Sequence, residues 1–422
     1  MSIQERDKKH IWHPLTQHKT SADCIGIVKA KGAMLWDELG NSYIDGIASW
    51  YTAMYGHCNE YIVDAVSRQM RELDQVVFTG FTHQPAVELS EKLIAILPTN
   101  QEKIFFNDNG STSVETAIKM AFQYFYNDGQ QRNTLIAFED GFHGDTFGAM
   151  SVSGLSVYNG PFEDFFLDVK RIPVPTPQNL EKVLSLLKKI LSENDCAAFV
   201  YEPLVQGAAG MKMYSTEGLE AILTTCKAHN VLCIADEVMT GFGKTGKHFA
   251  SSYLDIQPDI ICLSKALTAG MLPMGITSCT QKVYDAFLDD EIGKGFFHAH
   301  TYSANPLACA SAIAGIDLLL SKGIQDDIKR VINSHRKFSE VLKKESGVLN
   351  VRQKGIILAF DLRIEMDRYG KKRNQLFQFF MERGVFLRPL GNTVYLLTPY
   401  VISTKELQLL YDVILESIKE FT

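Results

Sequence analysis

Paired cysteines, a surplus of basic charge and long apolar runs are all missing from this chain of 422 residues. The eight cysteines include no CxxC pair, and several of them lie in apolar stretches with the pattern of strands. This arrangement predicts buried free thiols in a reducing compartment, because disulfides persist in oxidising ones. We therefore expect a cytoplasmic protein, and we expect no metal site.

Charge and hydropathy exclude two further classes of protein. The chain carries 42 basic and 49 acidic residues, a net charge of −7, and no long basic run, so we expect no nucleic-acid partner. Its most apolar long segment, residues 308–320, is interrupted by Asp317 and is too short to span a bilayer. The first residues, MSIQERDKKHIWHP, are charged without an apolar stretch behind them, so we expect neither a signal peptide nor a membrane partner.

A regular alternation of strand and helix patterns begins near residue 60. The composition is that of an ordinary globular enzyme, with 46% hydrophobic and 22% charged residues. We expect helices at 60–74, 84–96, 111–126, 178–193 and 216–229, and strands at 103–106, 134–138, 197–201, 231–235 and 260–263. Such alternation predicts an α/β fold with a mostly parallel sheet between two layers of helices.

The two ends of the chain show a different pattern. Residues 25–46 have the turn residues of a small meander, and a helical pattern dominates 305–344. Short strands are then expected at 349–353, 356–362 and 393–397, with a helix at 369–382 and a last helix that starts with the capping box of Ser403 and Glu406. We expect this tail to pack with the meander as a discontinuous α+β domain, residues 1–47 and 325–422, beside a large domain of residues 48–324.

One acid and one amine stand at the ends of two predicted strands. Asp236 ends the apolar run 231–235, and Lys265 follows the run 260–263. Side chains at the carboxyl ends of adjacent parallel strands point into one crevice. Singly, such an acid more often caps a helix and such a lysine is more often solvated, but a lysine between an apolar strand and small residues is not typical of a surface. Pyridoxal phosphate needs both groups, a lysine for its Schiff base and an acid to keep its ring nitrogen protonated.

Two stretches resemble a known family. DEVMTGFGKTG (236–246) and LSKALTAG (263–270) resemble the signature of class III aminotransferases of fold type I. The resemblance implies pyridoxal phosphate as cofactor, with Lys265 and Asp236 as the catalytic residues and Lys265 also in contact with substrate. It implies two half-reactions at one site, in which the amine of Lys265 moves a proton while Asp236 keeps the cofactor ring charged.

Other motifs of the family suggest how the cofactor is held. The turn NDNGSTSVE (107–115) enters a helix, where free N–H groups and the hydroxyls of Ser111 and Thr112 make an anion site as readily as an ordinary cap. In the family this turn holds the cofactor phosphate, which implicates Gly110 and Ser111. DGFHGDT (140–146) resembles the motif whose aromatic residue stacks on the cofactor ring, so Phe142 would cover one face and Val238 the other.

Two more features concern the neighbourhood of the cofactor and a partner chain. Glu202 ends another predicted strand, and the matching residue lies near the cofactor in the family, with a role that varies. The loop HAHTYSANP (298–306) matches one that crosses to the partner subunit. It implies a homodimer with shared active sites, in which His300 and Thr301 contact the cofactor and Ala299 contacts the substrate.

Three stretches resemble one branch of the family, and they are IWHPLT (11–16), DGIASWYTAMYGH (45–57) and GVFLRPLGNTVYLLTPY (384–400). That branch aminates 8-amino-7-oxononanoate to 7,8-diaminononanoate in biotin biosynthesis, with S-adenosylmethionine as amino donor. The acceptor is a long apolar chain that ends in a carboxylate, which suits Arg388 as a bidentate partner and Trp50 and Tyr395 as walls. A surface arginine and a core tryptophan are the alternatives for Arg388 and Trp50.

Three positions and one loop depart from that branch and leave the donor open. The branch usually has tyrosine where this chain has Leu15, often tyrosine at Phe142, and arginine at Lys244. Its HGPT loop reads HAHT here, residues 298–301. Leu15 and Phe142 belong to the substrate site and lack a hydroxyl, so a hydrogen bond to the donor is lost although stacking survives. Lysine or another amine is therefore an alternative donor. Another ω-aminotransferase, an aminomutase, or a catalytically silent cofactor-binding protein are further alternatives, and the Asp236–Lys265 pair speaks against the last.

Overall fold

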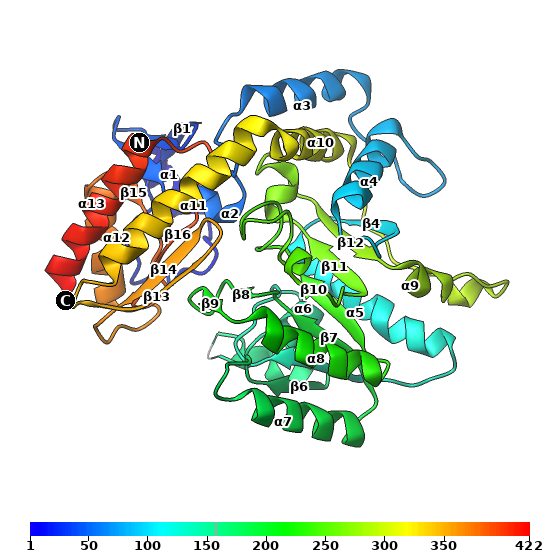
Figure 1. Ribbon diagram of the computed structural model, residues 1–422. Coiled ribbons are helices and arrows are strands. Elements are labelled where there is room, and N and C mark those ends of the chain that lie inside the picture. Colours follow the sequence, from blue (N-terminus) through cyan, green and yellow to red (C-terminus); the bar gives the residue numbers. More distant parts are fainter. Residues whose placement is uncertain (157) are drawn as a thin grey trace.

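A seven-stranded sheet runs through the larger lobe of the computed structural model, which describes residues 1–156 and 158–422 (Figure 1). In spatial order its strands are β4 (Lys103–Asn107), β12 (Gly275–Cys279), β11 (Ile260–Leu263), β10 (Leu232–Asp236), β7 (Cys196–Tyr201), β5 (Thr134–Phe138) and β6 (Val169–Ile172). Only β12 is antiparallel to its two neighbours, so the prediction of a mostly parallel sheet is confirmed.

Each central strand is apolar on both sides because both faces of the sheet are covered. In β10, Leu232 and Ile234 belong to one apolar cluster, whereas Cys233 and Ala235 belong to the other. Side chains alternate across a strand, so this alternation means that each face of the sheet carries its own core. The predicted strands were therefore recognisable as continuous apolar runs.

Helices pack on both faces of this sheet. On one face α5 (Gly110–Asn127) contacts β11 and β12, and it also packs against α6 (Phe147–Val152). On the other face α8 (Thr216–Ala228) lies against β10 and α7 (Leu180–Glu193) lies against β6. The remaining helices of this lobe are α3 (Glu60–Glu72), α4 (Gln84–Ile96), α9 (Gln281–Asp285) and α10 (Pro306–Leu320).

A smaller lobe combines the two ends of the chain (Figure 1). One sheet has the order β1 (Ile27–Lys31), β2 (Met34–Asp37), β3 (Ser42–Asp45) and β15 (Val385–Phe386); the other has the order β13 (Val348–Lys354), β14 (Ile357–Leu362) and β16 (Thr393–Leu396). The helices are α11 (Lys322–Leu342), α12 (Lys371–Glu382) and α13 (Thr404–Phe421). Because β15 pairs with β3, the predicted packing of the tail on the N-terminal meander is confirmed.

The helical stretch predicted at 305–344 consists of two helices. α10 and α11 are separated by Ser321, which caps α11 through its hydroxyl, and the two axes are bent by 67°. Among the residues that the structure describes, no single helix combines the length and apolar character needed to cross a membrane, and only this bent pair meets the test jointly. We propose that the domain boundary lies near this bend, with residues 48–324 in the large domain.

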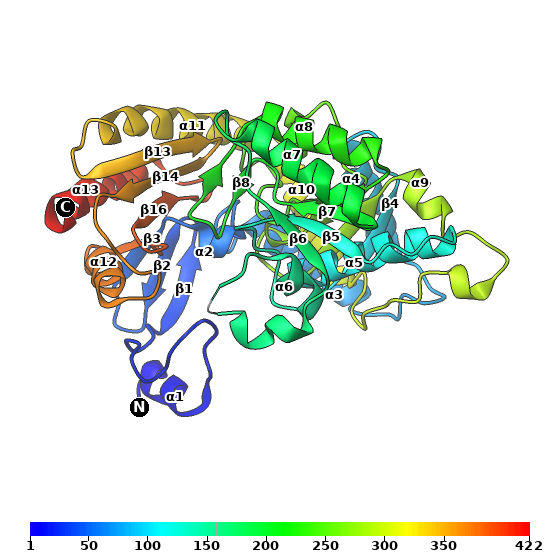
Figure 2. The same ribbon diagram turned by 90° about the horizontal axis from the view of Figure 1, so that it is seen from below.

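Three short segments complete the chain. The N-terminal helix α1 (Ile3–His10) and the loop after it lie near β1 at one end of the molecule (Figure 2). A two-stranded ribbon of β8 (Val205–Gln206) and β9 (Lys212–Met213) reaches from the large lobe toward the small one. The short turn α2 (Ala48–Tyr51) joins the lobes and enters the site described below.

Candidate active site

The main cavity lies where the two lobes meet and has a volume of about 1920 Å³. Its floor is formed by the carboxyl ends of β10 and β11, as expected for an open α/β sheet. The small lobe and the N-terminal segment supply the rest of the wall. This position brings residues from four distant parts of the sequence into one space.

Lys265 and Asp236 line this cavity from adjacent parallel strands. Asp236 pairs with Cys262 in the sheet, and Lys265 follows three residues later, so both side chains leave the same sheet edge. Lys265 has a φ of 48°, which is rare for a residue with a side chain and is typical of functional sites. Within the described residues, its amine makes no hydrogen bond to the protein.

The chemistry of the Lys265 amine follows from its surroundings. Burial lowers the pKa of Lys265, and the charges of Asp236 and Glu202 only partly oppose that effect. A larger share of the amine is therefore neutral near pH 7, as a nucleophile or a base requires. The ring of Tyr51 lies 5.5 Å from Nζ and shields one side of it.

His143 holds Asp236 in place. Nδ1 of His143 lies 2.7 Å from Oδ2 of Asp236, and the N–H of Val238 donates to Oδ1 at 3.0 Å. Burial alone would lower the pKa of His143, but the hydrogen bond and charge of Asp236 outweigh it, so the pKa is raised. Asp236 is thus an oriented, nearly buried carboxylate with one imidazole partner.

Glu202 is a second buried acid beside this pair. Its carboxylate accepts hydrogen bonds from the N–H groups of Phe142 at 3.0 Å and Gly207 at 2.8 Å. Burial raises the pKa of Glu202 to about 7, aided by the charge of Asp236 and opposed by His143 and the two N–H groups. Glu202 therefore changes its protonation state in the range where most enzymes work.

The N-terminus of α5 forms a cradle for an anion. Asn109 caps the helix, and its side chain and that of Thr112 form a reciprocal capping box. The N–H groups of Gly110 and Ser111 have no acceptor among the described residues, so they are free for a ligand. The hydroxyl of Thr112 is occupied by Asn109, so only that of Ser111 remains from the predicted hydroxyl pair.

Close packing explains the glycine in this cradle. Gly110 does not have a positive φ, so it does not serve the turn. A Cβ at this position would lie 2.9 Å from Cγ1 of Val238, which itself lines the cavity. Phe142 also lines the cavity, and 44% of its surface is exposed. Phe142 and Val238 are thus both available to a flat ring above Asp236.

The far end of the cavity carries an arginine without an acidic partner. The guanidinium of Arg388 lies 4.9 Å from the ring of Trp50, and in the described part of the chain it makes no ion pair or hydrogen bond. Tyr51 donates a hydrogen bond of 2.9 Å to Tyr395, and both line the cavity. An apolar wall with one free guanidinium can receive a chain that ends in a carboxylate.

These residues fit pyridoxal phosphate. The free N–H groups at α5 suit the phosphate, Asp236 suits a protonated ring nitrogen, and the unbonded amine of Lys265 suits the aldehyde carbon. Nε2 of His143 is buried without a partner among the described residues, so the imidazole is held on its Nδ1 side by Asp236.

Residues 16–418 match the aminotransferase class-III family. The chain belongs to this family. An adenosylmethionine-8-amino-7-oxononanoate aminotransferase of Synechococcus elongatus is 41% identical over 97% of this chain and 99% of its own length. One of Geobacter sulfurreducens is 36% identical, with 100% of this chain and 98% of that protein covered. The predicted family is therefore confirmed.

Solved structures agree with this class III aminotransferase in fold. The adenosylmethionine-8-amino-7-oxononanoate aminotransferase of Methanocaldococcus jannaschii has a TM-score of 0.94 at 33% identity, covering 99% of this chain and 98% of that one. An amine transaminase of an uncultivated Pseudomonas species, solved with bound pyridoxal phosphate, has a TM-score of 0.90 at 27% identity over 98% and 99%. The predicted fold type and cofactor are confirmed, and the protein is a pyridoxal phosphate-dependent aminotransferase.

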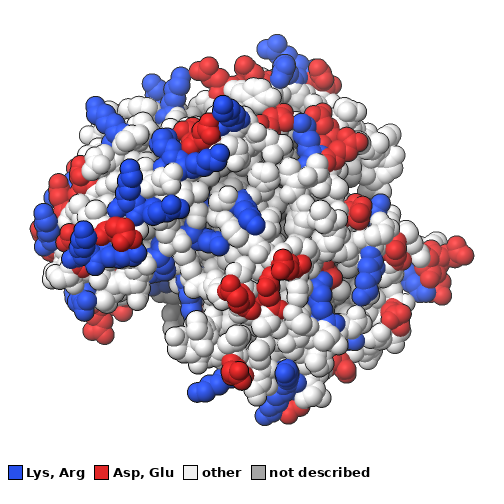
Figure 3. Space-filling view, in the orientation of Figure 1, with Lys and Arg blue, Asp and Glu red and all other residues white. Residues whose placement is uncertain are grey.

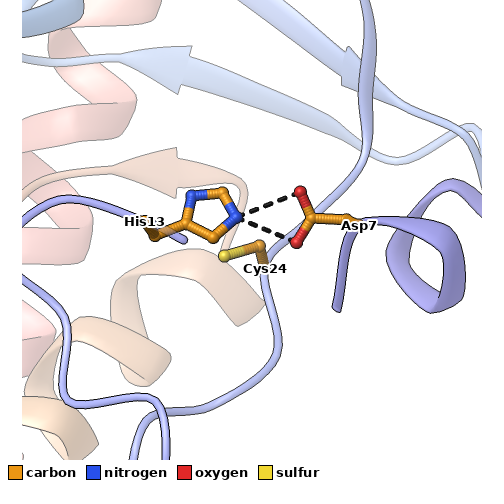
Figure 4. Close-up of side chains that lie close together, drawn as sticks. All are labelled: Asp7, His13 and Cys24. Carbon is orange, nitrogen blue, oxygen red and sulfur yellow. Dashed lines mark hydrogen bonds and ion pairs between the residues drawn. The ribbon is translucent and has the colours of Figure 1, made fainter. Parts of the chain in front are cut away.

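The N-terminal segment of the aminotransferase reaches the cavity through Leu15. The loop that carries it starts with His13, whose Nε2 lies 3.0 and 2.9 Å from the two carboxylate oxygens of Asp7 (Figure 4). Cys24 lies beside this pair, and the three side chains have the donor atoms of a metal site. The Asp7–His13 hydrogen bond ties α1 to the loop that follows it, so we interpret the cluster as an anchor for the loop.

Three predicted contacts of the aminotransferase lie away from this chain's own cavity. Ala299, His300 and Thr301 do not line it; Nδ1 of His300 lies 3.3 Å from Asp108, and the carbonyl of Thr301 accepts from Gln75 at 3.0 Å. The prediction gave these residues to a partner chain. Their contribution to a shared site stays a prediction.

Lys244 is buried and also lies outside the cavity wall. Its amine donates to the carbonyl of Gly241 at 2.7 Å. Burial lowers the pKa of Lys244 to about 7, helped by the charge of Lys265 and opposed by Glu237. The change from arginine at this position therefore affects the interior behind the site rather than its surface.

Some residues of the site were not predicted as such. His143 is one of them, although it stands next to Phe142 in the DGFHGDT motif, which was the available signal. Tyr51 is another, because a strand or helix pattern gives no sign of a hydroxyl pair with Tyr395, 344 positions away. Tyr158 and Tyr369, in edge contact at 5.1 Å at the cavity wall, carry no local signal at all.

Proposed function

We propose that this aminotransferase transfers an amino group to 8-amino-7-oxononanoate, giving 7,8-diaminononanoate in biotin biosynthesis, with S-adenosylmethionine as donor. The observation that carries this proposal is the unpartnered guanidinium of Arg388, which lies against Trp50 at the end of a long cavity that also holds Lys265. The relatives in Synechococcus elongatus and Geobacter sulfurreducens bear the name of that reaction. The apolar chain of the acceptor matches the apolar wall of the cavity, and its terminal carboxylate matches the positive charge of Arg388.

The residues act in distinct places in this proposal. The N–H groups of Gly110 and Ser111 bind the cofactor phosphate, and His300 and Thr301 of a second copy of the chain add to it in a homodimer. Phe142 and Val238 hold the two faces of the ring. When bound, pyridoxal phosphate supplies an electron sink for the carbon that loses its proton.

The chain itself moves that proton. Nζ of Lys265, whose pKa is lowered by burial, takes the proton from the α-carbon of the donor. Asp236, oriented by His143, keeps a positive charge stable at the ring nitrogen. Tyr51 covers Lys265 and excludes water from one side of it. In the second half-reaction Arg388 fixes the acceptor carboxylate, and Lys265 returns a proton to the former carbonyl carbon.

The test is a panel of donors and acceptors with the purified enzyme, with the product identified by mass spectrometry. We expect 7,8-diaminononanoate from 8-amino-7-oxononanoate and S-adenosylmethionine. Failure to aminate this acceptor with any donor would remove the proposal. Leu15 and Phe142 favour one second candidate, in which lysine donates to the same acceptor, because neither side chain offers a hydroxyl to S-adenosylmethionine. Product formed only with lysine would establish it.

Arg388→Ala separates the acceptor from the donor. A hydrogen bond between charged groups contributes about 1.5–3 kcal/mol, so we expect KM for the acceptor to rise about 10- to 150-fold. We expect a smaller effect on the donor half-reaction, because the carboxylate of S-adenosylmethionine is attached to the carbon that reacts at Lys265, whereas Arg388 lies at the far end of the cavity. Separate stopped-flow measurements of the two half-reactions check this. An equal loss in both would contradict the assigned place of Arg388.

The cellular setting follows from the same proposal. We propose a cytoplasmic enzyme, because all eight cysteines are free and six of them are buried. Its small-molecule substrates are made and used in biosynthesis, where a reducing compartment is usual.

A further inference from the structure

Four consecutive residues of α2, none of them glycine, adopt the left-handed conformation. Ala48, Ser49, Trp50 and Tyr51 have φ values of 47°, 45°, 65° and 73°. The N–H of Tyr51 donates to the carbonyl of Ile47 and that of Thr52 to Ala48, both at 2.9 Å, so the segment is a regular left-handed turn. L-residues rarely form such turns, and one persists only where the surroundings determine it.

This turn places the side chains that the acceptor would meet. Trp50 points its ring at the guanidinium of Arg388, with 4.9 Å between them. Tyr51, next in sequence, is buried, bonds to Tyr395 at 2.9 Å, and has its ring 5.5 Å from Nζ of Lys265. The left-handed backbone therefore sets two walls of the cavity at once.

A buried carboxylate holds the turn. Asp45 is fully buried, and its Oδ1 accepts from the N–H of Ile47 at 3.1 Å. Its Oδ2 accepts from the N–H of Ser49 at 2.7 Å, from the Ser49 hydroxyl at 3.1 Å and from Nε2 of His57 at 2.9 Å. The donors come from the start and the middle of the turn and from the chain beyond it, so Asp45 closes the turn on both sides.

Asp45 also lies beside the strand that leads to Arg388. It pairs with Phe386, two residues before Arg388, and the N–H of Gly46 donates to the carbonyl of Phe386 at 3.0 Å. His57 is fixed from the other direction, through two backbone hydrogen bonds with Gly32 at 3.0 and 2.8 Å. Asp45 thus connects the turn that carries Trp50 to the strand that leads to Arg388.

We propose that Asp45 and His57 are positioning residues for the acceptor half-reaction. They hold the left-handed turn in which Trp50 lies against Arg388, and they thereby set the affinity for a long keto acid that ends in a carboxylate. Neither residue lines the cavity, so we expect both to act through the turn rather than on the acceptor itself. The inference rests on the proposed function for the identity of the acceptor, but the geometry of the turn is independent of it.

The first experiment compares His57→Leu with His57→Gln. Leucine removes the donor to Asp45, whereas glutamine keeps a side-chain N–H at similar reach. We expect His57→Leu to raise KM for 8-amino-7-oxononanoate at least about tenfold and to leave the donor half-reaction within about twofold, and His57→Gln to recover most of the loss. His229→Leu, at an exposed histidine beyond α8, is the matched control and should match wild type.

A purely structural role predicts a different result. In that case both half-reactions of His57→Leu would fall by the same factor, together with the thermal midpoint, and the proposal would be overturned. If His57→Leu does not fold, Ser49→Ala is the milder variant, because it removes only one hydroxyl donor from Asp45. It should raise the acceptor KM by about two- to tenfold without changing the donor half-reaction.

The second experiment follows the conformation of the turn by tryptophan fluorescence, without any substrate. Trp12→Phe and Trp36→Phe leave Trp50 as the only tryptophan of the chain. In the cofactor-free protein, His57→Leu should shift the emission of Trp50 and increase its quenching by acrylamide, and His57→Gln should restore both. Unchanged emission and quenching in His57→Leu would overturn the inference even if the acceptor is correct. A wild-type enzyme that ignores 8-amino-7-oxononanoate would instead overturn only the proposed function.

Discussion

Lys265 has a strained backbone conformation. The residue is half-buried, and its amine has no hydrogen-bond partner in the described chain. In Lys265→Ala the base that moves the proton is gone, while the phosphate cradle at α5 is intact. We expect turnover to fall by at least about 10³-fold and the cofactor to remain bound. Turnover rates and the visible absorbance spectrum of the purified variant check this. A variant with wild-type turnover would exclude Lys265 as the proton carrier.

Lys244 gives a prediction about stability and pH. Its pKa is about 7 in the folded state, against an ordinary value of 10.5. Between these values the unfolded chain binds a proton that the folded chain does not, so folding is penalised at pH 7 and regains stability as pH rises toward 10.5. The penalty is on the order of a few kcal/mol.

Lys244→Met should remove that penalty, because methionine fills a similar volume without a charge. We expect the thermal midpoint of the variant to exceed that of wild type by a few degrees at pH 7, and the difference to shrink toward pH 10. Differential scanning calorimetry of both proteins across this range is the measurement. A gap that grows with pH would show that the amine of Lys244 stabilises the fold.

At the scale of elements, the start of α5 and the loop after β10 must fit each other. Gly110→Ala puts a methyl group 2.9 Å from Cγ1 of Val238, so either the start of α5 or the side chain of Val238 must move. We expect cofactor affinity to fall about tenfold, because anion binding depends on the position of the first N–H groups. Gly160→Ala, where the added methyl meets open space, is the control.

Val238→Ala provides the reciprocal change. The double variant Gly110→Ala, Val238→Ala should bind pyridoxal phosphate more tightly than Gly110→Ala alone, since the clash is relieved. Equilibrium dialysis or fluorescence titration with the cofactor measures both. Independent, additive losses would mean that the two elements do not share this contact.

The left-handed backbone of the turn α2 has a conformational free-energy cost. A left-handed residue other than glycine costs about 1–2 kcal/mol, so four in a row are a substantial penalty. The hydrogen bonds to Asp45 and the burial of Tyr51 offset it. A right-handed turn would avoid the penalty, but it would direct Trp50 and Tyr51 elsewhere.

At the scale of the whole molecule, the predicted homodimer with shared sites concerns the surface around the loop 298–306. Lysine, arginine and acidic side chains are interspersed on the face seen in Figure 3, without a large area of one sign. Several large apolar side chains are nevertheless exposed, among them Phe297, directly before the loop predicted to cross to a partner, and Tyr302 within that loop. Exposed apolar surface of this kind is typical of an interface.

Mixing two inactive variants tests the shared site. Lys265→Ala lacks the base, and Thr301→Glu places a negative charge where the partner's phosphate is expected. Each alone should be inactive. After mixing through reversible unfolding or co-expression, mixed dimers contain one intact site, so activity should return to about a quarter of wild type. No recovery, with mixed dimers confirmed by mass spectrometry, would place Thr301 away from the partner's cofactor.

Local pattern predicted five of the seven strands of the large sheet. The runs 231–235 and 260–263 are continuous and β-branched or apolar, so their strands and the acid and amine after them were predictable within a residue of β10 and β11. β12 was missed, because Gly275–Cys279 has no pattern that distinguishes an antiparallel strand inserted between β4 and β11. β6 was missed as well, because two of its four residues, Lys170 and Arg171, are charged. Strand order is a property of packing, and a single run of residues does not contain it.

The sequence by itself determined the α/β fold, the family and the pair Asp236 and Lys265, because these depend on residue types at short, regular spacings. Only the tertiary structure decided that His143 bonds Asp236, that Tyr51 meets Tyr395, and that Ala48–Tyr51 winds left-handed around Asp45. Contacts between positions far apart in the chain, and backbone conformations imposed by buried hydrogen bonds, arise from the whole fold. No local pattern carries them.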